Sequence, residues 1–209
     1  GGFAMAYIAL IAGALCGVLR CLLKKYIFSA CTTLLCACAV AAGAGVGSKL
    51  PLMAGLLVSV AADWLLAHQK EGGNRFLYGV IGFFFAHLMF AWYAFERFDF
   101  SWGALIASLI LLAGYIAYMA FRMLPRVAKG LKLPLTLYML VSLLSLYCAL
   151  SMGTAQLEKA LYAVGIGAIV FSDTMIGESE FAGVEKAHRL VLPTYYLCHV
   201  LIALSTLVR

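Results

Sequence analysis

Charged residues are scarce in this sequence, where 15 Lys+Arg and 9 Asp+Glu make up 11% of 209 residues. A soluble domain typically has about 25% charged and about 45–50% apolar residues. Here 65% of the residues are hydrophobic. The shortage of charge therefore excludes an ordinary soluble domain, a disordered chain and a nucleic-acid-binding protein.

Several motifs of hydrolases and metal sites are absent as well. The seven cysteines form no CxxC pair, and nearly all lie inside apolar runs, where cysteine packs as a small hydrophobe. The GxSxG motif of a serine nucleophile is missing. Neither His87 nor His199 has the HxxxH or HxxE spacing of a metal site. We therefore expect no metal and no cofactor.

Long apolar runs are what the sequence does contain. A bilayer core of about 30 Å needs about 20 helical residues, and eight runs approach or exceed that length. They are 3–19, 26–47, 50–67, 76–95, 100–121, 135–151, 160–177 and 190–208. The connections between them are short. The sequence predicts an all-α integral membrane protein in which residues 1–209 form a single eight-helix transmembrane domain.

Basic residues predict the orientation of these spans. Alternate connections hold 11 of the 15 Lys+Arg, namely Arg20, Lys24, Lys25, Lys70, Arg75, Arg122, Arg126, Lys129, Lys132, Lys186 and Arg189. Cytoplasmic loops carry such an excess. We therefore expect both termini on the outer side and a multi-pass location in a bacterial inner membrane or the endoplasmic reticulum. The same rule explains the net charge of +6 without an anionic partner.

Two acids, Asp63 and Asp173, lie well inside the apolar runs. An aspartate at the centre of a membrane helix costs about 2.5–3.5 kcal/mol. The predicted spans place each about 6–8 Å below the cytoplasmic helix end. Ser59 lies one turn before Asp63, and Ser172 adjoins Asp173. A carboxylate pair of this kind can keep one group protonated and the other ionised, so it suits general acid–base chemistry. The alternative is an interhelical hydrogen bond at each acid.

His87 and His199 lie deeper in the fourth and eighth spans, with Tyr195 one turn before His199 and Tyr138 in the sixth span. Each could pack through a hydrogen bond or line a cavity. His87 follows Asp63 by 24 residues, and His199 follows Asp173 by 26. This weak internal similarity could reflect two four-helix halves related by a parallel repeat.

Four segments resemble those of the YhhN-like family, which includes the TMEM86 lysoplasmalogenases. They are LLVSVAADWLLA, FLYGVIGFFFAHLMFAWYAF, GIGAIVFSDTMIGESEF and YYLCHVLIALS, in the family's order over residues of about 50–205. Two positions depart from the family pattern. Ala62 replaces the usual glycine before Asp63, and His199 stands where the family usually has glutamine. These departures bear on the substrate more than on the fold.

The resemblance implies a membrane hydrolase that cleaves the vinyl ether of lysoplasmalogens to a fatty aldehyde and glycerophosphoethanolamine or glycerophosphocholine. Asp63 and Asp173 would be the acid–base pair. The supporting or substrate-binding residues would be His87, His199, Tyr195, Ser59, Ser172, Tyr138 and Lys25, of which Lys25 could meet the lipid phosphate. The expected partners are a lysophospholipid and membrane lipids, and Gly13-x-x-x-Gly17 is compatible with a homodimer.

Two rival hypotheses stay open. Intramembrane Asp and His residues also serve as proton relays, so a proton-coupled transporter of a small molecule or lipid is the main alternative. Transporter sites usually lie near the bilayer midplane in broken helices. A purely structural subunit is the other reading, and it explains two buried acids least well.

Overall fold

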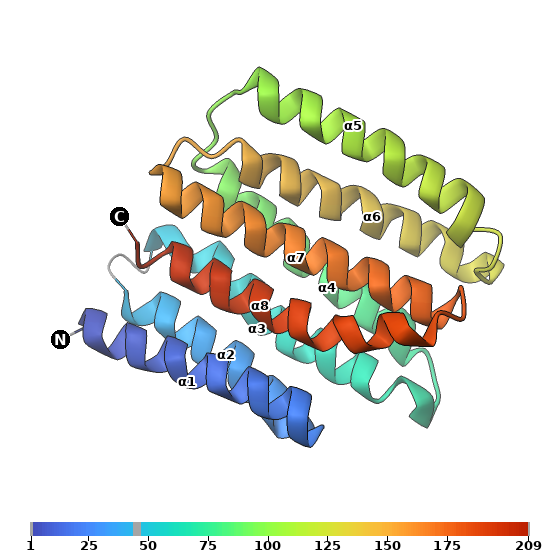
Figure 1. Ribbon diagram of the computed structural model, residues 1–209, viewed down its shortest axis with the longest axis horizontal. Helices are drawn as coiled ribbons and strands as arrows, with labels where there is room; N and C mark the ends of the chain where they lie inside the picture. Colours follow the sequence, from blue (N-terminus) through green and yellow to red (C-terminus); the bar gives the residue numbers. More distant parts are fainter. Residues whose placement is uncertain (1, 44–46, 209) are drawn as a thin grey trace.

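A computed structural model describes residues 2–43 and 47–208, in which eight α-helices follow one another (Figure 1). Their bounds are α1 Gly2–Leu23, α2 Tyr26–Ala42, α3 Leu50–Ala67, α4 Arg75–Phe95, α5 Trp102–Tyr118, α6 Lys129–Leu150, α7 Gln156–Glu180 and α8 His188–Ser205. A π-helical turn, η3 Met119–Met123, continues α5. Short 3₁₀ turns are η1 Gly47–Lys49, η2 Gln69–Glu71 and η4 Glu185–Ala187.

Seven of these helical segments are long and apolar enough to cross a membrane. α2 has 17 residues, which is the short end of the range for a span, and residues 44–46 of the predicted second span lie outside the described part. The helical, multi-pass character is thus confirmed. Both chain ends lie at the same end of the helices (Figure 1), while their location on the outer side stays a prediction, and Arg209 lies outside the described residues.

Several helices extend beyond the predicted spans toward the end of the molecule that holds most of the basic residues. α1 continues to Leu23, four residues past its predicted span. α6 begins at Lys129 and contains Pro134, which the apolar run from residue 135 missed. The ring of Pro134 opposes the carbonyl of Gly130, which is exposed, so water can replace the lost backbone bond. α7 continues to Glu180, and Asp173 is therefore seven residues from its end, about 10 Å rather than the 6–8 Å expected.

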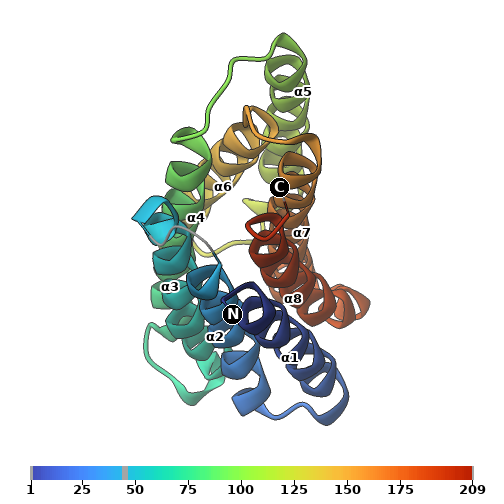
Figure 2. The ribbon, with the colours of Figure 1, turned by 90° about the vertical axis from the view of Figure 1, so that its left-hand side faces the viewer.

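The helices form a closed ring with one outlier. In the ring α1, α2, α3, α4, α6, α7 and α8 each pack against the next, and α8 returns to α1. α5 lies outside the ring against α6, as the view along the helices shows (Figure 2). Among its described residues only Ala104 is buried, so α5 is the helix least held by the rest of the protein.

Helix neighbours repeat between the two halves of the chain. α3 packs on α4 as α7 packs on α8, and α2 packs on α3 as α6 packs on α7. The crossing contacts also match, because α4 meets α6 and α8 meets α2. This arrangement agrees with the parallel repeat that the spacing of Asp and His residues suggested. The pair α1 and α2 packs much more closely than the pair α5 and α6.

Glycines allow several of these close approaches. A Cβ atom built on Gly13 would meet Leu35 of α2, and one on Gly17 would meet Tyr196 of α8. The Gly13-x-x-x-Gly17 face is thus occupied inside the chain. A homodimer remains a prediction, and it would have to use another surface.

Gly165 and Gly167 of α7 offer a test of this packing. A Cβ atom at Gly165 would lie 2.9 Å from Ile202 Cγ1 and 3.3 Å from the Cys198 carbonyl, whereas one at Gly167 would meet nothing within 4 Å. We expect Gly165→Val to destabilise the protein by about 1–3 kcal/mol through overpacking. The matched control Gly167→Val should leave stability near wild type. Thermal unfolding in detergent measures both, and equal unfolding temperatures would contradict the close α7–α8 contact.

Candidate functional site

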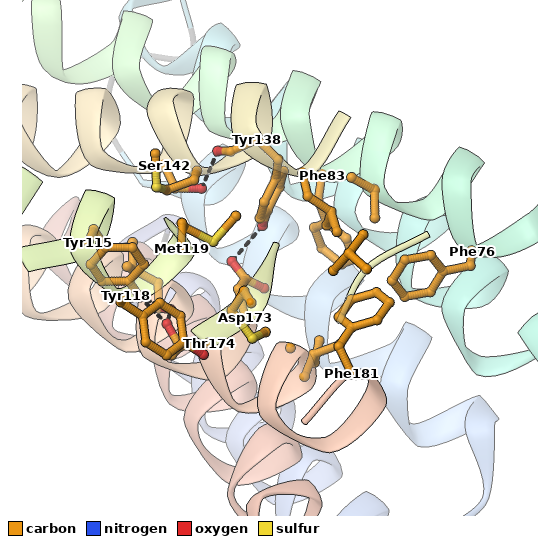
Figure 3. A pocket seen from close by; sticks show the side chains of 18 of the residues that line it. Phe76, Phe83, Tyr115, Tyr118, Met119, Tyr138, Ser142, Asp173, Thr174 and Phe181 are labelled. Carbon is orange, nitrogen blue, oxygen red and sulfur yellow. Dashed lines mark hydrogen bonds between the residues drawn. The ribbon is translucent and has the colours of Figure 1, made fainter. Parts of the chain in front are cut away.

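A cavity of about 90 Å³ opens among α4, α5 with η3, α6 and α7 (Figure 3). Its wall is mainly apolar, and the side chains include Leu66, Phe76, Val80, Phe83, Met119, Met123, Leu135, Met139, Val170, Ile176 and Phe181. Polar groups come from Tyr115, Tyr118, Tyr138, Ser142, Asp173 and Thr174. The loose packing of α5 leaves this space, and Asp173 is the one carboxyl group among the described residues that line it.

Asp173 is held by side chains from two other helices. Tyr138 Oη of α6 donates a hydrogen bond of 2.5 Å to Asp173 Oδ2 (Figure 3). His87 Nε2 of α4 lies 3.5 Å from the same oxygen. The side chain of Asp173 is 15% exposed, whereas that of His87 is fully buried. One carboxyl group thus combines access from the cavity with two polar partners.

Hydrogen bonding sets the orientation of the His87 ring. Ser145 Oγ donates to the Ser142 carbonyl at 2.8 Å, so its oxygen is available to accept from His87 Nδ1, 2.9 Å away. This pattern puts a proton on Nδ1 and turns Nε2 toward Asp173. His87 is therefore placed to exchange a proton with the carboxyl group. In other functional histidines, too, a hydrogen bond to one ring nitrogen orients the other.

Asp63 belongs to a second polar cluster. Ser29 Oγ of α2 donates to Asp63 Oδ2, and Ser29 Oγ lies 2.5 Å from Tyr196 Oη of α8. The positive charge of Arg20 of α1 also acts on Asp63. Asp63 is not among the described residues that line the cavity. Leu66 is, and it lies three residues further along the same helix face.

Tyr195 lies beside the cavity wall. Its buried hydroxyl donates to the Ser59 carbonyl of α3 at 3.3 Å. Its ring packs edge-on against Phe83, a residue of the cavity wall, and against Tyr196, which belongs to the Asp63 cluster. Tyr195 thus connects the surroundings of Asp63 with the wall of the cavity.

The two clusters match under the helix repeat. Asp63 accepts from Ser29 of α2, and Asp173 accepts from Tyr138 of α6. His199 Nδ1 lies 3.0 Å from Thr33 Oγ1 of α2, as His87 Nδ1 lies beside Ser145 of α6. The second helix of each half thus supplies the hydroxyl partner of its own Asp and of the other half's His. The similarity of Asp and His spacing has a structural counterpart.

The remaining predicted residues take other positions. Ser59 Oγ donates to the Gly55 carbonyl at 2.8 Å within α3. Ser172 Oγ donates to the Val191 carbonyl at 2.9 Å and so joins α7 to α8. Lys25 is exposed at the start of α2. His199 is buried beside Tyr195, with ring centroids 4.4 Å apart. The structure brings Tyr138 and His87 to Asp173, and it does not bring Ser59, Ser172 or Lys25 to either carboxyl group.

Three polar partners were missed by the sequence analysis: Ser29, Ser145 and Tyr196. Each is a polar residue in an apolar helix. The sequence alone does not distinguish such a residue from one that only packs. Among the residues that the structure describes, no three His, Cys, Asp or Glu side chains gather in a way that could hold a metal ion. The chemistry available at the cavity is therefore that of a carboxyl group, a phenol and an imidazole.

The sequence of the chain is similar to that of known proteins. The chain is 32% identical over 168 residues to a protein from Sus scrofa named lysoplasmalogenase TMEM86B, an alignment that covers 79% of this chain and 67% of the relative. No solved structure matches the chain. The family model of the YhhN family matches residues 24–206, and the chain therefore belongs to the YhhN family.

Proposed function

We propose that this protein is a membrane hydrolase that cleaves the vinyl ether bond of lysoplasmalogens. The observation that carries the proposal is the carboxyl group of Asp173, which faces a mainly apolar cavity and contacts Tyr138 and His87. The name of the similar Sus scrofa protein supports this substrate class.

Hydrolysis of a vinyl ether begins with transfer of a proton to carbon. The C=C bond takes up this proton at its outer carbon, and the carbon bonded to oxygen becomes an oxocarbenium-like cation. A carboxylic acid can donate the proton, and its carboxylate then stabilises the cation. Glycosidases use paired carboxyl groups around a cation of the same kind. In our proposal, Asp173 touches the reacting atoms at this stage.

The second half of the reaction adds water. A carboxylate takes one proton from the water while the water oxygen bonds to the cationic carbon. The product of this step is a hemiacetal. The C–O bond to glycerol then breaks, the hemiacetal hydroxyl loses its proton, and the glycerol oxygen gains one. The products are a fatty aldehyde and a glycerophospho-ethanolamine or -choline. In this proposal Asp63 and Asp173 divide the acid and base roles.

Tyr138 would act as a hydrogen-bond donor to Asp173, and His87 would act as its proton acceptor and orienting group. The phenol that donates to Oδ2 stabilises the carboxylate after it has given up its proton. His87, fixed through Ser145 with Nε2 unprotonated, can take a proton from the site and release it again between turnovers. These roles explain why two polar side chains are directed at one carboxyl group inside an apolar bundle.

A proton-coupled transporter would use the same Asp173–His87 contact as a proton relay. Neither Asp-bearing helix is broken, because α3 and α7 run continuously through Asp63 and Asp173. This continuity favours the hydrolase, since transporter sites usually lie in discontinuous helices. Reconstitution in liposomes separates the two functions. Aldehyde release without proton flux supports the hydrolase, and substrate-dependent proton flux without product supports the transporter.

Replacing the acids tests the proposed chemistry. We expect Asp173→Asn to lower kcat by about 10²–10⁴-fold, because the amide cannot donate or accept the catalytic proton, and Asp63→Asn to lower it by about tenfold or more. Asp99→Asn, at an exposed acid outside the cavity, is the matched control and should keep wild-type activity. Aldehyde release by the purified protein is the measurement. If both Asp63→Asn and Asp173→Asn keep the wild-type rate, the mechanism is wrong.

Tyr138→Phe removes the hydroxyl that donates to Asp173 and leaves the ring in place. We expect kcat to fall by about tenfold, equivalent to about 1.4 kcal/mol, with KM little changed, because the bond assists the carboxyl group rather than substrate binding. Tyr147→Phe, about two and a half turns further along α6, is the matched control, since Tyr147 packs against Phe98 and does not line the cavity. An unchanged kcat for Tyr138→Phe would remove Tyr138 from the proposed mechanism.

A further inference from the structure

A second hollow, of about 420 Å³, adjoins the cavity at the basic end of the helices. Tyr118 and Thr174 line both spaces, so the two lie side by side at these residues. The second hollow differs in character because it is lined by Arg122 and Lys186 together with Glu178. An apolar cavity beside a charged hollow suits a ligand with an apolar chain and a charged headgroup.

The guanidinium of Arg122 is held in a fixed orientation. Its Nε and Nη2 each donate to Glu178 at 2.6 Å, one bond to each carboxylate oxygen. Tyr118 Oη donates to Glu178 Oε1 at 2.8 Å and secures the carboxylate in turn. Glu178 is nearly buried, whereas Arg122 is about half exposed. The paired geometry therefore positions an exposed guanidinium rather than hiding it.

Arg122 retains donors for a ligand while it is paired with Glu178. A guanidinium has five N–H groups, and the two bonds to Glu178 use two of them. Lys186 lines the same hollow. Two cations and one acid leave a net positive charge there. Arginine forks and lysine ammonium groups are the common protein partners of phosphate oxygens.

The spacing along α7 fits a lysophospholipid. Asp173 and Glu178 are five residues apart, which is about 7.5 Å along the helix axis. In a lysoplasmalogen the phosphorus is five covalent bonds from the vinyl ether oxygen, about 6 Å in an extended chain with bonds of about 1.5 Å. An ether placed at Asp173 thus puts the phosphate at the axial level of the Arg122–Glu178 pair, which lies about 140° around α7 from Asp173, on the side of Tyr118 and Thr174.

We infer that Arg122 and Lys186 form the binding site for the phosphodiester of the lipid substrate, with Glu178 as the residue that positions Arg122. This inference rests on the proposed function, and it assigns phosphate binding to the second hollow rather than to Lys25. The π-helical turn η3 contributes to both spaces, since Met119 and Met123 line the apolar cavity and Arg122 lines the charged one.

Two substrates test the assignment: a lysoplasmenylcholine and a 1-O-alkenylglycerol, which has the same vinyl ether but no phosphate. For Arg122→Gln we expect KM for the phospholipid to rise about tenfold or more, because charge-assisted hydrogen bonds are lost. Lys186→Gln should raise it severalfold. Neither change should affect cleavage of the alkenylglycerol. Lys129→Gln removes an exposed cation at the same end that lines neither hollow, and it should behave as wild type on both lipids.

A double variant guards against misfolding, because Arg122→Gln alone leaves a nearly buried carboxylate without its partner. Arg122→Gln/Glu178→Gln removes both charges and should show the same rise in KM with wild-type thermal unfolding. Unchanged phospholipid KM in the Arg122 and Lys186 variants, or equal losses on the two substrates, overturns the assignment.

Two further arms separate the remaining explanations. Inorganic phosphate is added as a competitor of alkenylglycerol cleavage, and we expect it to inhibit weakly or not at all. Strong inhibition that Arg122→Gln abolishes, with unchanged phospholipid KM, would assign the site to free phosphate and overturn the lipid assignment. If the wild-type protein releases aldehyde from neither lipid, the proposed function itself fails, and the phosphate assignment falls with it.

Discussion

A polar side chain inside a membrane helix must find a partner within the protein, because the surrounding hydrocarbon offers none. This requirement governs the arrangement around Asp173. Its carboxyl group on α7 accepts from Tyr138 of α6 and faces His87 of α4, and His87 is held in turn by Ser145 of α6. Three helices are thereby fixed relative to one another by polar contacts, while apolar packing sets their distances.

The two halves of the repeated architecture differ beside the cavity. Each half holds its Asp against a hydroxyl group of its own second helix and its His against a hydroxyl group of the other half's second helix. In the first half α1 packs closely on α2 and also on α8, with glycines at the contact. In the second half α5 stands outside the ring. The space that α5 leaves is the cavity that Asp173 lines.

This asymmetry gives the two acids different surroundings. Asp173 lines the cavity. Asp63 accepts from Ser29 and lies three residues before Leu66, which lines the cavity. Under the proposed function, the position of α5 provides an apolar site for the lipid chain beside Asp173.

The sequence by itself determined the membrane class, most helix bounds and the two acids, because long apolar runs and rare buried charges are local signals. The bounds of α3 and α4 agree with their apolar runs nearly residue by residue. The start of α6 was missed, since its first turns are polar and contain a proline. Which partner each acid meets was decided by the tertiary structure. Tyr138 and Asp173 are 35 residues apart, and Ser29 and Tyr196 are 167 apart, so no periodicity within one helix can relate them. The pairing of Arg122 with Glu178 likewise arises from the packing of η3 against α7, because two residues 56 positions apart meet only where separate helical segments contact each other.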